Sequence, residues 1–99
     1  MSKTTQVQDP EFNHLRTILL DRAQTHGEYY NTSKISQDIK QSIRGYLDNL
    51  DHDMVESIEM IANKLGRILS GSSTHIDSWQ DIAGYAQLIV DRLEEDEQR

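Results

Sequence analysis

The sequence contains no cysteine, a single proline and a single phenylalanine among its 99 residues. The absence of cysteine excludes disulfide bonds, a thiol nucleophile and any cysteine-ligated zinc or iron–sulfur site. No apolar run is longer than three residues, so we expect no segment that crosses a membrane. These absences favour a small cytoplasmic domain.

Basic residues are also scarce. There are 10 Lys and Arg against 17 Asp and Glu, which gives a formal charge of −7. A protein that coats DNA needs clustered Lys and Arg to contact phosphates, so this balance argues against such a role. An acidic chain of this kind is compatible with a cation-dependent carboxylate site, or with a protein that mimics nucleic acid.

Apolar residues recur at three- and four-residue spacing in four segments, which predicts four amphipathic helices. They are expected at about 11–24, from near 34 to 47, from a cap at Asp51 or Asp53 to about 70, and from a cap at Asp77 to about 93. Gly27 and Gly71 are placed to end the first and third helices. No segment alternates as a strand. The expected fold is an all-α, four-helix antiparallel bundle over residues 11–95, with tails at 1–10 and 96–99.

The third and fourth expected helices carry the clearest apolar stripes. We expect both stripes, including the only tryptophan, to form the core. Their members are Met54, Ile58, Ile61, Ala62, Leu65, Ile68 and Leu69 on one helix, and Trp79, Ile82, Ala83, Ala86, Ile89, Val90 and Leu93 on the other.

The opposite faces of these two helices are polar, apart from Met60 and Leu88. Gly84 lies on the same face as Leu88 and permits close approach of another helix. Together they predict a homo-oligomer, most simply a dimer, through these faces. The alternative is that single exposed apolar residues are ordinary on protein surfaces.

The same two helices carry four carboxylates, Glu56, Glu59, Asp77 and Asp81. Mg²⁺ and Mn²⁺ prefer oxygen ligands, and carboxylates that converge between helices hold such an ion while a phosphate completes its shell. The alternative is that acidic residues near helix N-termini complement the helix dipole, with Asp77 acting as the N-cap.

Two segments resemble a known family. "SIEMIANKLGRILSGSSTHIDSWQDIAGYAQLIVDRL" and "RAQTHGEYYNTSKISQDIK" resemble a small, mostly phage-encoded helical family. More distantly, the chain is similar to MazG-like all-α nucleotide pyrophosphohydrolases and to phage nucleotide-modification-associated domains. Those enzymes carry E-x-x-E and E-x-x-D motifs on consecutive helices, bind Mg²⁺, and cleave nucleoside triphosphates to monophosphate and pyrophosphate.

The resemblance implies roles for particular residues. Glu56 and Glu59 match E-x-x-E, and Asp81 matches the Asp of the second motif, whereas Ser78 stands where that motif has Glu. By this resemblance Glu59 and Asp81 would be catalytic, and Glu56, Glu59, Asp77 and Asp81 would hold Mg²⁺ or Mn²⁺.

Four other residues are candidates for contact with the substrate. His26, Lys64 and Arg67 would bind phosphate, and Tyr29 would stack on a base. The alternatives are that His26 caps helix carbonyls, that Tyr29 packs over the core, and that Lys64 and Arg67 complement a helix C-terminus.

The expected function is therefore binding or Mg²⁺-dependent hydrolysis of a nucleotide by a phage-type protein in the host cytoplasm. The alternative is a non-catalytic acidic module that inhibits a host protein or sequesters a nucleotide signal.

Overall fold

The computed structural model describes residues 10–98, without the side chains of residues 10 and 23–26. It contains four α-helices: α1 (Pro10–His26), α2 (Tyr29–Ile43), α3 (His52–Ser70) and α4 (Ile76–Glu97). A short 3₁₀ turn, Arg44–Tyr46, extends α2. The described residues contain no strand, so the predicted all-α class and the four helices are confirmed.

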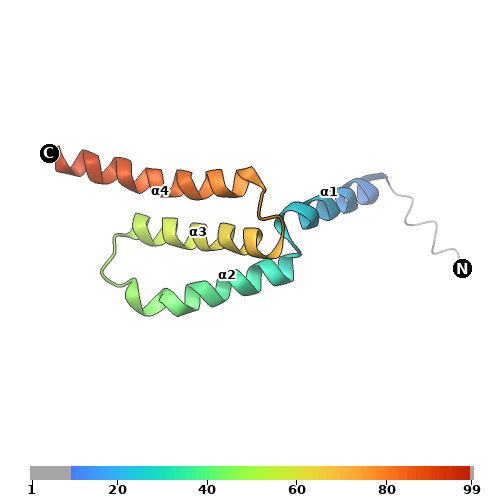
Figure 1. Ribbon diagram of the computed structural model, residues 1–99, viewed down its shortest axis with the longest axis horizontal. Coiled ribbons are helices and arrows are strands. Elements are labelled where there is room, and N and C mark those ends of the chain that lie inside the picture. The colour runs from blue at the N-terminus through green and yellow to red at the C-terminus, as the bar shows by residue number, and fades with distance from the viewer. Residues whose placement is uncertain (1–9, 99) are drawn as a thin grey trace, which may run out of the picture.

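Three of the helices form a single layer (Figure 1). α3 lies in the middle, with α2 along one side and α4 along the other, each antiparallel to α3. α2 and α4 do not touch each other, and α1 continues beyond one end of the layer. The radius of gyration is 18.6 Å, against about 13 Å for a compact domain of this length. The helices of one chain, over the described residues, therefore form an open layer rather than a closed bundle.

The two lines of contact along α3 are built from small side chains. Of the residues whose side chains the structure describes, seven are buried, and five of these are Ser, Ala or Gly. At Gly66 the helices come so close that a Cβ atom would lie 2.6 Å from the carbonyl oxygen of Thr32 on α2. On the other side of α3, the Ser57 hydroxyl donates to the carbonyl of Tyr85 on α4 at 3.1 Å. The buried residues are Ser36, Ser57, Ala62, Lys64, Gly66, Ile68 and Ser78.

Most of the expected core is not buried. Among the described residues, only Ala62 and Ile68 are buried apolar side chains. Trp79 is 51% exposed and donates its indole N–H to the carbonyl of Ser73 at 2.8 Å, and Leu69 is 66% exposed. The prediction of a core position for Trp79 was wrong because α2 and α4 pack on the flanks of α3, so that Trp79 and Leu69 stay exposed and the rest of the α3 stripe, apart from the two buried residues, is only half-buried.

The helix ends follow the predictions in part. α2 begins at Tyr29, about five residues earlier than expected, and α4 has His75 as its N-cap, so Asp77 lies in the first turn. Asp51 is the N-cap of α3, as one of the two expected positions, but its carboxylate makes no capping bond. Gly71 follows α3 with φ −121°, so it is not left-handed.

Gly27 has the left-handed conformation that the sequence predicts, with φ +81°. We expect Gly27→Ala to lower the free energy of unfolding by about 2 kcal/mol, since a side chain at positive φ costs roughly 1–2 kcal/mol and a Cβ there would lie 2.6 Å from the backbone of Ser70. Urea denaturation at one fixed protein concentration measures the change.

Gly84→Ala is the matched control for this variant. Gly84 is helical and has nothing within 4 Å of its Cβ position. Alanine there is expected to raise the free energy of unfolding by about 0.5–1 kcal/mol. Equal effects of the two variants would contradict the account of Gly27.

Candidate functional site

A polar pocket lies between α2 and α3. Its volume is about 340 Å³, and every residue that lines it comes from these two helices. Hydroxyl and amide groups dominate the lining beside three basic side chains. The lining residues are Tyr29, Thr32, Ser33, Ser36, Gln37, Lys40, Met60, Asn63, Lys64 and Arg67.

The charge of the pocket is opposite to that of the chain. Lys40, Lys64 and Arg67 line it, and no carboxylate does, although the chain has a formal charge of −7. Lys40 and Arg67 are half-buried, and within residues 10–98 no ion pair involves either of them. Two unneutralised cations in a partly desolvated recess attract an anion more strongly than the same groups in open water.

Lys64 is the third cation, and it is tied to a neighbour. Its side chain is 10% exposed, and Nζ lies 3.0 Å from Oδ2 of Asp81 on α4. This ion pair joins α3 to α4 and fixes the carboxylate of Asp81 against Lys64. A buried ammonium group needs such a partner, because burial of an unpaired charge is strongly unfavourable.

Hydrogen bonds hold the polar wall of the pocket in place. The buried Ser36 hydroxyl donates to Oδ1 of Asn63 at 2.7 Å, and the amide nitrogen of Asn63 lies 3.6 Å from the sulfur of Met60. The hydroxyls of Thr32 and Ser70 are 2.7 Å apart at the end of the same contact. The Ser36–Asn63 and Thr32–Ser70 bonds cross from α2 to α3 and fix the separation of the helices at the pocket, while the Asn63–Met60 contact lies within α3.

The structure brings together three of the four predicted substrate-binding residues. Tyr29, Lys64 and Arg67 line the one pocket, whereas the side chain of His26 lies outside the described residues. Tyr29 is 85% exposed, so it does not pack over the core. Sequence reasoning missed Lys40. It falls on a polar stripe of α2 with Ser33 and Ser36, a spacing that would have indicated a shared face.

The four carboxylates do not assemble into a metal site. Glu56 is exposed beside Tyr85 and Leu88, and Glu59 is half-buried. Asp77 lies 4.0 Å from Nε2 of His75, and Asp81 binds Lys64. Within the described residues, no three Asp, Glu or His side chains lie close enough together to hold a metal ion. The structure therefore does not bring together the four carboxylates of the Mg²⁺ site that the resemblance implies.

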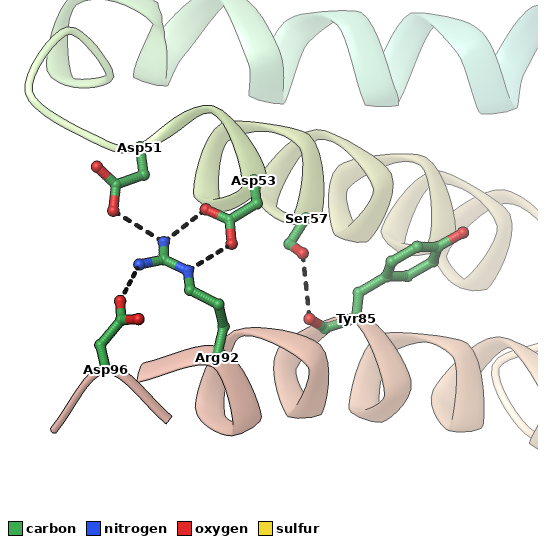
Figure 2. A network of polar contacts seen from close by, with 6 residues as sticks. All are labelled: Asp51, Asp53, Ser57, Tyr85, Arg92 and Asp96. Carbon is green, nitrogen blue, oxygen red and sulfur yellow. Dashed lines mark hydrogen bonds and ion pairs between the residues drawn. The ribbon is translucent and has the colours of Figure 1, made fainter. Parts of the chain in front are cut away.

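A second polar network joins α3 to α4 at the far end of the layer (Figure 2). The Arg92 guanidinium donates to both carboxylate oxygens of Asp53, at 2.8 and 2.6 Å. It also donates to Asp51 at 2.8 Å and to Asp96 at 2.9 Å. Its hydrogen bonds to Asp53 hold the pKa of that carboxyl below its usual value. The carboxylate of Asp51 therefore serves Arg92 instead of capping α3.

The chain was compared with protein-family models, with curated proteins and with solved structures, and nothing matches it. In residues 10–98, none of the helices combines the length and the apolar character that a bilayer span requires.

The Arg92 network makes a prediction about acid stability. Because the pKa of Asp53 is lowered by folding, its contribution is fully present above the ordinary value of 3.8 and is lost as the pH falls through the lower folded value. We expect Asp53→Asn to be less stable at pH 7 and to lose less stability than wild type on acidification below about pH 4. Thermal unfolding across this pH range measures both effects.

Asp48→Asn removes the same charge from the turn before α3, outside the Arg92 network. It is expected to keep the steep acid dependence of the wild type. A parallel flattening in both variants would assign the acid dependence to net charge rather than to Arg92.

Proposed function

We propose that this protein binds a phosphate-bearing nucleotide in the pocket between α2 and α3. The observation that carries the proposal is the pair Lys40 and Arg67, neither of them in an ion pair within residues 10–98, on a recess lined by no carboxylate in a chain of net charge −7. Lys64 also lines the recess, but Asp81 holds its ammonium group. A volume of about 340 Å³ falls at the lower end of the range of small-ligand sites, about 300–1,000 Å³.

The lining offers a role for each part of such a ligand. The Arg67 guanidinium presents paired N–H donors that match phosphate oxygens, and Lys40 adds a mobile point charge. Thr32 and Ser33 supply hydroxyls. The exposed ring of Tyr29 lies at the rim, where it can stack on a base.

Binding is better supported than hydrolysis. Hydrolysis by the chemistry of MazG-like enzymes needs converging carboxylates, and here they lie apart while Asp81 is engaged by Lys64. The resemblance to those enzymes supports a nucleotide as the phosphate ligand. We therefore favour a protein that holds or sequesters a nucleotide without turning it over.

Removal of a pocket cation tests the site. We expect Lys40→Ala and Arg67→Ala each to weaken binding of ATP, dATP or inorganic pyrophosphate about tenfold or more, because a charge-assisted hydrogen bond contributes roughly 1.5–3 kcal/mol. Isothermal titration calorimetry at fixed salt measures the affinities.

Lys34→Ala is the matched control for Lys40→Ala. Lys34 lies on the same helix and is exposed. Its Nζ atom lies 2.9 Å from Oδ2 of Asp38, and it does not line the pocket. It should leave the affinity unchanged. Equal weakening by Lys34→Ala and Lys40→Ala would indicate a diffuse charge effect and would remove the pocket as the site.

A substitution of Asp81 has opposite expected effects if the protein only binds a nucleotide and if it hydrolyses one. Asp81→Asn frees the ammonium group of Lys64 for an anion, so we expect tighter nucleotide binding. If Asp81 instead holds a catalytic metal, wild type releases pyrophosphate from a triphosphate with Mg²⁺ and the variant does not. An assay of pyrophosphate release, run beside the calorimetry, distinguishes the two.

A further inference from the structure

α4 carries a regular apolar stripe that nothing in the described chain covers. Its six members follow each other at intervals of 3, 4, 3, 4 and 3 residues, which is the a/d pattern of a coiled coil. All six are exposed, including Trp79 at 51%. The stripe consists of Ile76, Trp79, Ala83, Ala86, Val90 and Leu93.

α3 carries a second stripe on the same side of the layer. It runs between the contact lines with α2 and α4, opposite Met60, Asn63 and Arg67. α3 and α4 are antiparallel neighbours. The angular position of each stripe around its own helix, measured from the α3–α4 contact, places both stripes on the same side of the layer. The α3 stripe consists of Met54, Ile58, Ile61, Leu65 and Leu69. We call the two stripes together the apolar face; the pocket opens on the opposite face.

The total exposed surface of the chain is large for its mass. The chain exposes 7704 Å², about 1,900 Å² more than the roughly 5,800 Å² of a compact monomer of its mass. The apolar face contributes to the excess, as do the exposed apolar side chains of α1, among them Phe12, Leu15 and Leu19. A stable protein dimer buries about 800 Å² or more on each partner, which is less than half of this excess.

We infer that the apolar face binds a second copy of this chain, with the two α4 helices antiparallel about a twofold axis. In that alignment Ile76 meets the partner's Leu93, Trp79 meets the partner's Val90, and Ala83 meets the partner's Ala86. Bulky residues thus face medium ones, and the small residues at the centre allow close approach. A parallel pair in register would instead set Trp79 against its own copy.

Charge favours the same orientation. The last turn of α4 is acidic throughout, and it lies next to the stripe. A parallel pair would bring two such ends together. An antiparallel pair places each beside the partner's α4 N-terminus, where Asp77 is the acidic residue of the first turn and the helix dipole is positive. The acidic residues are Glu94, Glu95, Asp96 and Glu97.

Symmetry decides what covers α3. When two facing α4 helices are antiparallel, the twofold axis runs across the helices between the layers, so the partner's layer lies over the same side of α4 and its α3 covers α3. In a parallel pair the axis follows the helices, and the α3 stripe would stay uncovered. Only the antiparallel dimer buries the whole apolar face.

A charge placed in the stripe tests this surface. We expect wild type to be a dimer by light scattering. Ala86→Glu is expected to raise the dissociation constant of the dimer at least 100-fold. Leu88→Glu is the matched control, since Leu88 is exposed on the other side of α4, on the face with Met60 and Gly84 that the sequence indicated. Dissociation by Leu88→Glu but not by Ala86→Glu would overturn the proposal, as would a monomeric wild type.

Crosslinking tests the orientation without disrupting the interface. The chain has no cysteine, so an Ile76→Cys chain and a Leu93→Cys chain each carry one thiol. Oxidation of the mixture is expected to give a crosslinked pair of unlike chains. Each variant alone should stay uncrosslinked, because an antiparallel pair separates the two copies of residue 93 by roughly 25 Å, far beyond disulfide reach. Crosslinking of either variant alone would overturn the antiparallel arrangement.

Discussion

Small side chains along both flanks of α3 determine the shape of this protein. Gly66 lets the backbone of α2 approach α3, and Ser57 is bonded to the backbone of α4. Of the large side chains, Lys64 and Ile68 are buried at these lines of contact, and most of the others lie on the two broad faces of the layer. One face is then polar and carries the pocket, while the other collects the aliphatic residues.

The distribution of charge follows from the same layer. Three aspartates of the α3–α4 side converge on Arg92, and a fourth pairs with Lys64. Arg92 and Lys64 thereby offset part of the acidic charge where α3 meets α4. On the α2 side, Lys40 and Arg67 face hydroxyls and amides instead. An acidic chain can therefore present a basic recess, because salt screens the interaction between exposed charges that are more than roughly 8–10 Å apart.

Much of the secondary structure was predictable because the apolar residues of each helix recur at helical spacing within its own segment of the sequence. The position of Gly27 could be predicted for the same local reason, since a glycine after a helical segment supplies the left-handed residue that ends it. The packing was not predictable in this way. A stripe at 3.6-residue spacing shows which residues share a face but not what covers that face, so Trp79 was assigned to a core that one chain does not form.

The candidate site divides along the same line. Tyr29, Lys64 and Arg67 could be singled out as ligand contacts, and they line one pocket. The carboxylates of α3 and α4 shared a pattern in sequence, but their convergence depends on the rotation of one helix against the other. Ser78 is buried in the α3–α4 contact, and Asp81 turns toward Lys64. Neither the burial of Ser78 nor the ion pair of Asp81 can be predicted from the spacing of residues in the sequence.

The pocket is assembled by a single helical hairpin. All of its lining residues lie between Tyr29 and Arg67, on two helices joined by a short turn. Contacts between such neighbours close short loops at little entropic cost and form fast. The recess therefore depends on the most local part of the folding process, and neither α1 nor α4 contributes a wall to it.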